Sequence, residues 1–296
     1  MLGQDIQTRK AAERAPMNRG PEEVNTTGRG DVRRLGLVGC GAIGLELIRL
    51  LRPEAAISLE AIVVRAERVA QCREIMRPYG LSERVRTDRP ERIDTLVEAG
   101  GHSAIAQHIV PALNAGVSCI LASVGALASK ELLDEVQKAA RAGNAQVQII
   151  PGAIGGIDAL SAARLCGLSD VTYTGTKPPS AWRGTPAEDV VELDRLTKAT
   201  VVFEGSAREA ATLYPKNANV TATIALAGIG FDATRLRLVA DPSARENIHR
   251  LEARGSFGHF EITLSNAPLP SNPKTSALTL YSAMRAILNQ INAINI

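Results

Sequence analysis

Two sets of residues in this sequence have the types and spacing that small-molecule chemistry requires. The first is Gly39-Cys40-Gly41-Ala42-Ile43-Gly44, a GxGxxG pattern that follows a short apolar run and opens a segment of helical periodicity. The second is a set of four histidines, whose ordinary pKa of about 6.5 suits proton transfer near neutral pH. Together they indicate an enzyme that binds a phosphate-bearing cofactor and moves protons.

Each glycine of the pattern has a physical role. Gly39 permits a tight turn, Gly41 lets the backbone approach a pyrophosphate, and Gly44 lets the helix pack closely on the strand. Ala42 and Ile43 begin the helix, whose first amides offer hydrogen bonds and a partial positive charge to phosphates. The loop therefore predicts a bound dinucleotide.

The choice between NAD and NADP depends on the end of the second strand. An acidic residue for the adenosine ribose is expected about twenty residues past the glycines, but Val63-Val64-Arg65-Ala66-Glu67-Arg68 has no carboxylate at the usual place. Arg65, with Arg68, either receives the 2′-phosphate of NADP or only solvates a surface loop. Both NAD and NADP are expected as cofactors.

The histidines differ in their surroundings. His108 lies in a helical pattern and His259 in a strand pattern, which favours structural roles. His102 follows two glycines at the carboxyl end of a strand, where it would line a cofactor cleft. His249 lies in a polar stretch after an Asp-Pro pair. On the residues alone, His102 and His249 are equal candidates for a catalytic base.

The elements that must position these residues alternate in the first half of the chain. Strands are expected over residues 34–38, 57–64, 94–98, 117–122 and 146–150, and helices over 42–51, 105–115 and 130–142. Ser129 is expected to cap the last of these helices and Gly143 to end it. Because parallel strands need helical crossovers, the alternation predicts an α/β fold with a Rossmann doubly wound parallel sheet.

After Pro151 the pattern changes to longer polar loops and strands over 200–203, 235–240 and 257–265, which predicts a second α+β domain. Thr275 or Ser276 caps a last helix whose apolar stripe is expected to pack on the first domain. The expected organisation is a disordered tail (1–30), a Rossmann domain (31–150) completed by the helix at 275–296, and a catalytic and oligomerisation domain (151–274).

Composition excludes several classes of protein. The net charge of +3 is too small for a polyanion-binding field, and 3 % aromatic residues argue against base stacking, so no nucleic-acid partner is expected. The four cysteines lack metal-site spacing and indicate reduced thiols in the cytoplasm, with no metal. No apolar run reaches about 18 residues, and the N-terminus fits neither a signal nor a transit peptide, so no membrane association is expected.

Six ordered motifs resemble the L-aspartate dehydrogenase family, from about residue 33 to the C-terminus. They are Gly39 to Gly44, Ser123-Val124-Gly125-Ala126-Leu127, Pro151 to Gly156, Pro215 to Val220, Ala240-Asp241-Pro242 with Asn247-Ile248-His249, and Asn272 to Ser276. The resemblance implies a homodimer or higher homo-oligomer that oxidises L-aspartate to iminoaspartate with NAD or NADP. Water then yields oxaloacetate and ammonia, and the reaction is linked to NAD biosynthesis.

The resemblance also selects among the candidate residues. It implies that His249 is the active-site histidine and that Ala153 and Asn219 contact the nucleotide. A base is needed because hydride leaves Cα only from a neutral amine and because hydrolysis of the imine needs a deprotonated water. Ser123, after an apolar strand, is expected beside the nicotinamide, where small neighbours permit close approach of the ring.

Cationic or amide donors must hold the two carboxylates of the substrate. Lys274 is the first candidate, because its loop before the last helix combines a charge, the hydroxyls of Thr275 and Ser276, and helix amides. Lys216 and Lys177 are weaker candidates. The alternatives are another two-domain Rossmann reductase, of the homoserine dehydrogenase or dihydrodipicolinate reductase type, and a nucleotide-sensing protein without catalysis.

Overall fold

The computed structural model describes residues 32–295, except for the side chains of Lys216, Pro273 and Lys274. The expected disordered tail of residues 1–30 falls outside the described range. In the described part of the chain, no helix is long and apolar enough to cross a membrane.

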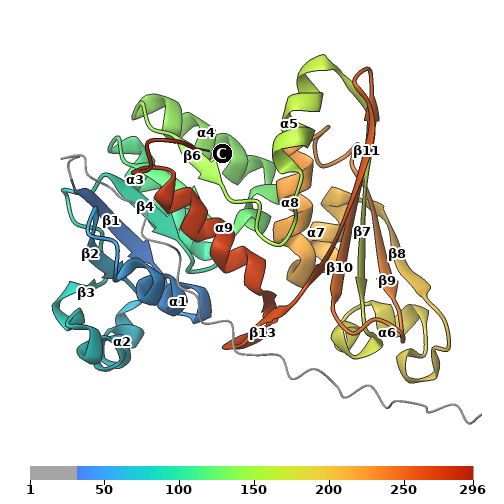
Figure 1. The fold of residues 1–296 in the computed structure, drawn as a ribbon, viewed down its shortest axis with the longest axis horizontal. Coiled ribbons are helices and arrows are strands. Elements are labelled where there is room, and N and C mark those ends of the chain that lie inside the picture. Colours follow the sequence, from blue (N-terminus) through green and yellow to red (C-terminus); the bar gives the residue numbers. More distant parts are fainter. Residues whose placement is uncertain (1–31, 296) are drawn as a thin grey trace, which may run out of the picture. The chain divides into compact units, whose positions relative to one another are not determined.

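The first half of the described chain forms a six-stranded parallel sheet (Figure 1). Its strands are β1 (Arg33–Val38), β2 (Ile57–Val63), β3 (Val85–Arg86), β4 (Thr95–Glu98), β5 (Ser118–Leu121) and β6 (Val147–Ile149), in the order β3-β2-β1-β4-β5-β6. Every neighbouring pair is parallel. The strand order reverses direction between β1 and β4, which places a ligand-binding crevice at their carboxyl ends. The predicted Rossmann sheet is confirmed.

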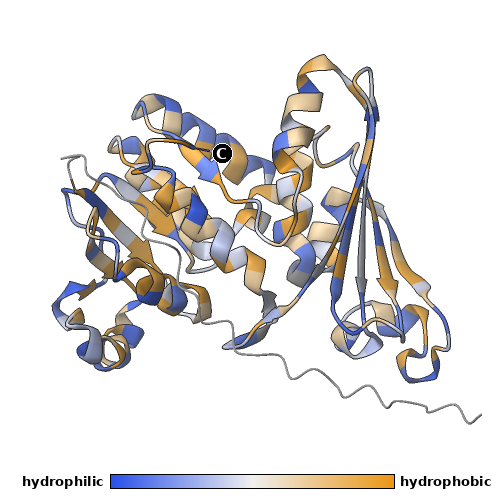
Figure 2. Ribbon diagram, in the orientation of Figure 1, coloured by the Kyte–Doolittle hydropathy of each residue, from blue (hydrophilic) through white to orange (hydrophobic). Residues whose placement is uncertain are grey.

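Helices cover both faces of this sheet. One face carries α1 (Ala42–Leu51), α2 (Val69–Met76) and α9 (Ala277–Leu288), and the other carries α3 (Val110–Asn114) and α4 (Lys130–Ala142). Leu47, Met76 and Leu280 belong to the core on the first face, whereas Leu113 and Val136 belong to the core on the second. The strands between the helix layers are mostly hydrophobic (Figure 2), so the C-terminal helix α9 helps to bury the parallel sheet.

The helix expected over 105–115 is only partly α-helical, since residues Ile105–Ile109 form a π-helical turn before α3. Short 3₁₀ turns join the other elements: Ala66–Arg68, Arg77–Tyr79, Ser82–Arg84, Val124–Ala128 (η5), Pro179–Trp182, Leu193–Arg195 and Pro215–Asn217. As expected, Ser129 caps α4, its hydroxyl accepting a hydrogen bond from the Leu132 amide at 3.2 Å.

The second half forms a five-stranded mixed sheet. Its strands are β7 (Leu168–Lys177), β8 (Thr200–Ser206), β9 (Arg235–Ala240), β10 (Asn247–Gly255) and β11 (Gly258–Asn266), in the order β11-β10-β7-β9-β8. Only β7 and β9 run parallel. Helices α5 (Ile157–Cys166), α7 (Ala207–Leu213) and α8 (Ala218–Ala227) cover one face. The α+β expectation is thus confirmed.

The remaining elements are the short helix α6 (Ala187–Val190) and the two-stranded pair β12 (Pro268–Leu269) and β13 (Asn272–Ser276), which leads into α9. Strand β10 was not among the expected strands, and His249 was expected only in a polar stretch. The alternating positions His249, Leu251 and Ala253 are buried, so the segment is a strand with a histidine on its inner face.

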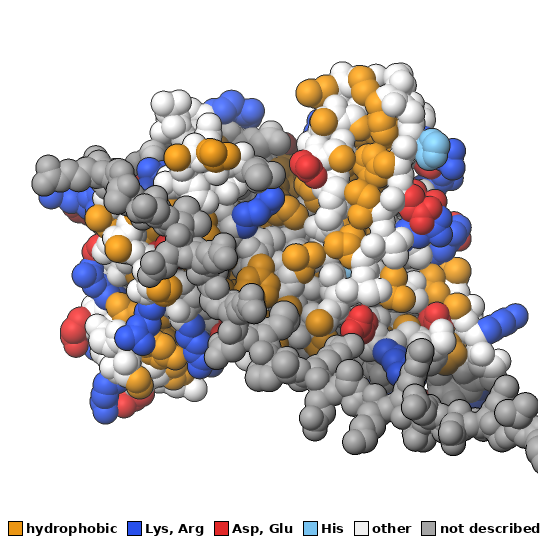
Figure 3. Space-filling view, viewed as in Figure 1, with side chains coloured by type: hydrophobic (Ala, Val, Ile, Leu, Met, Phe, Trp, Pro, Cys, Tyr) orange, Lys and Arg blue, Asp and Glu red, His pale blue; other side chains and the backbone are white. Residues whose placement is uncertain are grey.

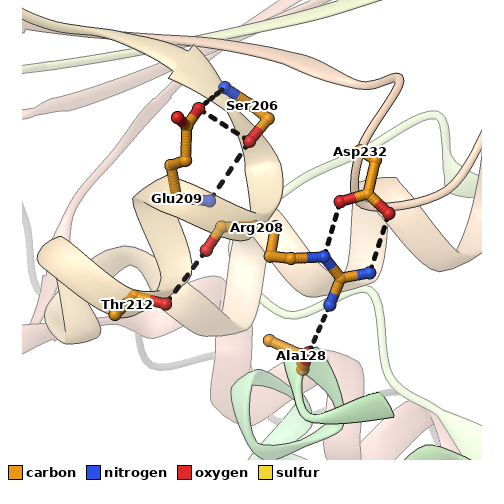
Figure 4. Close-up of polar contacts among 6 residues, drawn as sticks. All are labelled: Ala128, Ser206, Arg208, Glu209, Thr212 and Asp232. Carbon is orange, nitrogen blue, oxygen red and sulfur yellow. Dashed lines mark hydrogen bonds and ion pairs between the residues drawn. The ribbon is translucent and has the colours of Figure 1, made fainter.

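A set of polar contacts fastens the helical layer of the second sheet to η5 (Figure 4). Helix α7 begins with a capping box between Ser206 and Glu209. The Arg208 guanidinium binds both carboxylate oxygens of Asp232, at 2.5 and 2.9 Å, and donates to the carbonyl of Ala128 at 2.8 Å. Arg208 therefore connects the end of η5 to α7 and to the turn before β9.

Candidate active site

The glycine loop has the backbone geometry that its sequence predicts. Gly39 has φ +102°, and a Cβ there would lie 2.5 Å from the carbonyl oxygen of Ala99. A Cβ on Gly44 would collide with the Gly39 carbonyl, so that glycine lets α1 pack on the loop. A Cβ on Gly41 would meet no atom within 4 Å. Gly41 thus faces open space at the uncapped N-terminus of α1, which fits a pyrophosphate.

A cavity of ≈ 330 Å³ lies beside this loop. It is lined by Val38 to Gly41, Val63 to Arg65, Arg68, Ala99, Gly100, Ser103, Ala104, Gln107 and His108. Arg65 stands at its edge with a 75 % exposed side chain, 3.4 Å from Glu67. The buried Val64 stands where a ribose-binding carboxylate was expected. The cavity fits the adenosine half of a dinucleotide and offers guanidinium groups in place of an acid.

A second cavity, of ≈ 160 Å³, adjoins the first at Ala99. It brings together seven of the residues predicted from the sequence, namely Ile43, Ser123, Ala153, Asn219, Thr275, Ser276 and His249. Lys177, Asn217, Thr223, Asn247 and Thr279 complete much of its polar lining. Ala42 begins α1 next to this cavity, and His102 lines neither cavity. The two halves of the sequence therefore meet in one pocket.

Glu98, at the carboxyl end of β4, joins two loops of the crevice. Its side chain is fully buried. One carboxylate oxygen accepts hydrogen bonds from the amides of Gly100 and Gly101, at 2.8 and 2.9 Å, and from the Ser123 hydroxyl at 2.8 Å. The other accepts from the Ser123 amide at 2.8 Å. Glu98 therefore fixes Ser123 relative to the loop after β4.

His249 projects from the inner face of β10 and is 5 % exposed. Its Nδ1 lies 2.7 Å from the Tyr173 hydroxyl, which leaves Nε2 for the cavity that the ring lines. Burial, with a smaller contribution from the charge of Lys177, lowers the pKa of His249 to about 4. Burial raises the pKa of the Tyr173 phenol. In the absence of ligand the imidazole is therefore neutral near pH 7.

Lys177 supplies a cation to the same cavity from the end of β7. Its ammonium donates to the Asn217 side-chain oxygen at 2.5 Å and lies 5.4 Å from the centre of the Trp182 ring. As a candidate to bind the substrate carboxylates, Lys177 was expected to be weaker than Lys274, whose side chain is not among those that the structure describes. Trp182 is itself buried, and its indole donates to the Val239 carbonyl. The buried ring therefore lies beside the Lys177 ammonium within the second domain.

The side chain of Asn219 is held by the opposite half of the chain. Its oxygen accepts a hydrogen bond from the Gly125 amide at 2.9 Å and lies 3.4 Å from Nε2 of His102. A Cβ on Gly125 would lie 2.7 Å from the Cβ of Ala218. Gly125 thus permits the close packing of η5 on α8.

Two side chains hold the loop that follows β6. The Ala153 carbonyl accepts a hydrogen bond from the Asn266 amide group at 2.6 Å, and the Gly152 amide donates to the Ser282 hydroxyl at 3.0 Å. The hydroxyl of Ser276 caps α9 by accepting from the Leu278 amide at 3.2 Å. Of the predicted hydroxyls, Ser276 is therefore engaged in capping, whereas Thr275 accepts from Asn272 at 3.0 Å and lines the cavity.

Sequence reasoning did not assign Glu98, Tyr173 and Asn217 to the site, nor the cavity-lining Thr223 and Thr279. A carboxylate that ends an apolar strand, as Glu98 does, was the one local indication of a role at the crevice. Tyr173 and Asn217 reach the site only through the register of the second sheet and the position of the turn before α8. The described His, Cys, Asp and Glu residues form no group that could hold a metal ion.

Comparisons with known proteins agree with this geometry. Residues 158–290 match the family model described as aspartate dehydrogenase, C-terminal, and residues 39–149 match the NAD-binding domain of homoserine dehydrogenase. The chain is 52 % identical over 262 residues to the L-aspartate dehydrogenase of Pseudomonas aeruginosa, which covers 88 % of this chain and 98 % of that protein. It is 49 % identical over 264 residues to that of Ralstonia pickettii, covering 88 % and 99 %.

Among solved structures, the aspartate dehydrogenase of Thermotoga maritima superposes with a TM-score of 0.69 at 27 % identity, over 89 % of this chain and 99 % of that one. A hyperthermophilic archaeal homoserine dehydrogenase shares the fold, with a TM-score of 0.53 at 13 % identity over 87 % and 97 %. The assignment to a family rests on the sequence identity of about 50 % to the two L-aspartate dehydrogenases over nearly their whole length. The chain belongs to the L-aspartate dehydrogenase family and is an NAD(P)-dependent oxidoreductase.

Proposed function

We propose that this protein oxidises L-aspartate to iminoaspartate with NAD or NADP, and that hydrolysis then gives oxaloacetate and ammonia. The observation that carries the proposal is the second cavity, where His249 and Lys177 of the mixed sheet meet Ser123 and Ala153 from the crevice of the parallel sheet. A proton-exchanging group, a cation for carboxylates and a nicotinamide site are thereby combined in one pocket.

The dinucleotide would span both cavities. Gly41 and the first amides of α1 would hold the pyrophosphate, while Ser123, Ala153 and Asn219 would surround the nicotinamide. When bound, the nicotinamide supplies the acceptor for the hydride that leaves Cα of the amino acid. The protein's part is to bring Cα close to that acceptor and to keep both in the required orientation.

The substrate carries two carboxylates, and the cavity offers donors for them. Lys177 provides an ammonium group near His249, and Thr275 with Lys274 precedes α9. These residues are proposed to bind the carboxylates. Because opposite charge favours the protonated imidazole, a bound dicarboxylate raises the pKa of His249 from its low value in the unliganded site. His249 then exchanges a proton with the reacting amino acid or with water.

Steady-state kinetics with L-aspartate and both nucleotides test this function. His249→Ala is expected to lower kcat by a factor of about 10² to 10⁴ and to leave the Kd for NADP nearly unchanged. His259→Ala is a matched control, because His259 lies exposed on β11. An unchanged kcat in His249→Ala would remove the histidine from the mechanism. The activity would be refuted if the wild type did not reduce NAD or NADP in the presence of L-aspartate.

Arg65 is proposed to contact the 2′-phosphate of NADP, since it lines the first cavity where no carboxylate follows β2. Arg65→Asp should raise the KM for NADP more than the KM for NAD. Arg77→Asp, in the exposed turn after α2, removes a surface arginine away from this cavity and controls for net charge. Equal changes for both nucleotides would exclude Arg65 from the choice of cofactor.

A homodimer or higher homo-oligomer in the cytoplasm is proposed as the working state. Strand β11 is an edge of the mixed sheet, and hydrophobic side chains gather along it beside α5 (Figure 3). Leu165 on α5 is 90 % exposed, and Phe257 beside β11 is 37 % exposed. Sedimentation of the wild type and of Leu165→Glu tests this surface, since a monomeric wild type would contradict the proposal.

The proposed cytoplasmic location is supported by the cysteines. All four are free thiols, in keeping with a reducing compartment.

A further inference from the structure

We propose that Tyr173 is a positioning residue for His249: its hydroxyl donates a hydrogen bond to Nδ1 and so places the proton of the neutral imidazole on Nε2, facing the cavity. The inference rests on the proposed role of His249 in the reaction. It adds a residue that lines neither of the two cavities, and it states which nitrogen carries a proton in the enzyme without ligand.

The direction of the hydrogen bond follows from the surroundings of the phenol. Tyr173 is 1 % exposed, and within the described residues its hydroxyl has one hydrogen-bond partner, Nδ1 of His249 at 2.7 Å. If the hydroxyl accepted from an Nδ1–H group, its own hydrogen would be buried without an acceptor, which costs free energy. Donation to Nδ1 avoids that cost. A neutral imidazole that accepts at Nδ1 carries its proton on Nε2.

The pairing of β7 with β10 brings the rings of Tyr173 and His249 together. In the pairing of β7 with β10, His249 stands opposite Gly175, and Tyr173 stands opposite Leu251. A Cβ on Gly175 would lie 2.8 Å from the Tyr173 hydroxyl oxygen and 3.3 Å from Cζ. The phenol therefore leans along β7 over the space that a side chain at 175 would fill. The two rings lie within 14° of parallel, with centroids 6.0 Å apart.

Burial and a nearby charge keep the imidazole neutral. Burial is the larger cause, because it disfavours the charged form of the ring. Lys177 follows on the same strand as Tyr173, and its positive charge also disfavours a second proton on the ring. With Nδ1 engaged by Tyr173, the cavity meets an N–H donor from a neutral ring, beside the ammonium of Lys177.

This arrangement has a consequence for the substrate. An Nε2–H donor favours an acceptor, and the carboxylate oxygens of a dicarboxylic amino acid are the acceptors that the substrate brings. Taking up a proton at Nε2 requires the other tautomer, in which Nδ1–H donates to the phenol oxygen. A hydroxyl group serves as donor or acceptor after a rotation, so Tyr173 supports both tautomers and favours the first in the absence of ligand.

Nitrogen NMR of the full-length protein labelled with ¹⁵N-histidine tests the inference directly. His249→Gln assigns the signals of this ring. We expect Nε2 to carry the proton in the ligand-free wild type at neutral pH, and the Nδ1 resonance to be displaced by the hydrogen bond from its position in Tyr173→Phe. A proton on Nδ1, or an identical Nδ1 resonance in wild type and Tyr173→Phe, overturns the proposal.

Two further variants separate positioning from general stability. Gly175→Ala keeps the hydroxyl but fills its space, and Tyr214→Phe removes another buried phenol, which donates to the Val202 carbonyl at 3.3 Å. Gly175→Ala should shift the Nδ1 resonance as Tyr173→Phe does, and both should lower kcat about tenfold with the Kd for NADP unchanged. Tyr214→Phe should leave the ring signals as in the wild type.

These readouts also distinguish the inference from the function on which it rests. If the wild type does not oxidise aspartate, the proposed function fails, but the tautomer remains measurable in the ligand-free protein. If Tyr173→Phe does not fold, the wild type and Gly175→Ala still decide the matter. A wild-type Nε2–H tautomer with an unchanged kcat in a folded Gly175→Ala variant whose Nδ1 signal has shifted would reject the positioning role.

Discussion

Glu98→Gln is the substitution that tests most sharply how the crevice is held together. The Glu98 carboxylate accepts four hydrogen bonds, three at one oxygen from Gly100, Gly101 and the Ser123 hydroxyl, and one at the other oxygen from the Ser123 amide. Glutamine has nearly the same shape, but one of its two terminal atoms is a donor. At least one buried donor must then lose its acceptor.

The magnitude follows from which atom is replaced. The less costly orientation puts the amide nitrogen opposite the Ser123 amide, where two donors face each other and one bond is lost. A buried donor left unpaired costs about 1 to 3 kcal/mol, which corresponds to a decrease in Tm of about 2 to 10 °C for a protein of this size. Because Ser123 also lines the proposed nicotinamide site, the Kd for NADP should rise about tenfold.

Differential scanning calorimetry and a fluorescence titration with NADP measure these two effects. Glu60→Gln is the matched control, since Glu60 lies on β2 of the same sheet and forms a partly exposed ion pair with Arg84. The control should change neither quantity by a comparable amount. If Glu98→Gln keeps the wild-type Tm and the wild-type affinity for NADP, the reasoning about Glu98 is wrong.

Three other predictions follow from the structure. The pKa of His249 is lowered to about 4 in the folded state, so between about pH 6.5 and 4 the unfolded chain binds a proton that the folded chain does not. Stability therefore falls as the pH decreases through this window, by about 2 kcal/mol from pH 7 to pH 5, and urea unfolding of His249→Gln should lack that part of the decrease. Gly41→Ala should weaken NADP binding with little change in Tm, whereas Gly44→Ala, whose Cβ would meet the Gly39 carbonyl, should lower Tm; the reverse order in calorimetry and titration would contradict this. Arg208→Ala should raise the KM for NADP a few-fold, because η5 loses the hydrogen bond at Ala128, and unchanged kinetics would show that η5 needs no such support.

The parallel half of the fold was predictable because its signals are local. Helices α1 and α4 have the predicted bounds, 42–51 and 130–142. Apolar periodicity marks α1, and a serine cap and a following glycine mark the two ends of α4. The π-helical turn at Ile105–Ile109 was not predictable, because the same side-chain spacing fits an α-helix.

Strand β10 was missed for a reason connected with the site. Its buried face carries His249, Leu251 and Ala253, while Ile248 and Arg250 alternate with them on the other face. A histidine at a buried position, with an isoleucine on the opposite face, breaks the apolar alternation that identifies a strand. The buried His249 is thus the reason why the sequence pattern did not identify β10 as a strand.

The site itself was predictable only in part. The glycine loop could be interpreted from consecutive residues, and the family resemblance indicated His249, Ala153 and Asn219, which the structure places in one cavity. Neither Tyr173 nor Glu98 could be found in this way, because Tyr173 reaches His249 through the register of two strands, and Glu98 reaches Ser123 across two neighbouring strands.

Transfer of the Cα hydrogen is the measurement closest to the central claim. With L-aspartate deuterated at Cα and NADP, a single turnover of the wild type should place deuterium on the reduced nicotinamide. His249→Ala, with unchanged NADP binding, should transfer it at least about a hundredfold more slowly. Absence of deuterium in the reduced nucleotide, or transfer by His249→Ala at the wild-type rate, would contradict the assignment of this cavity as the active site.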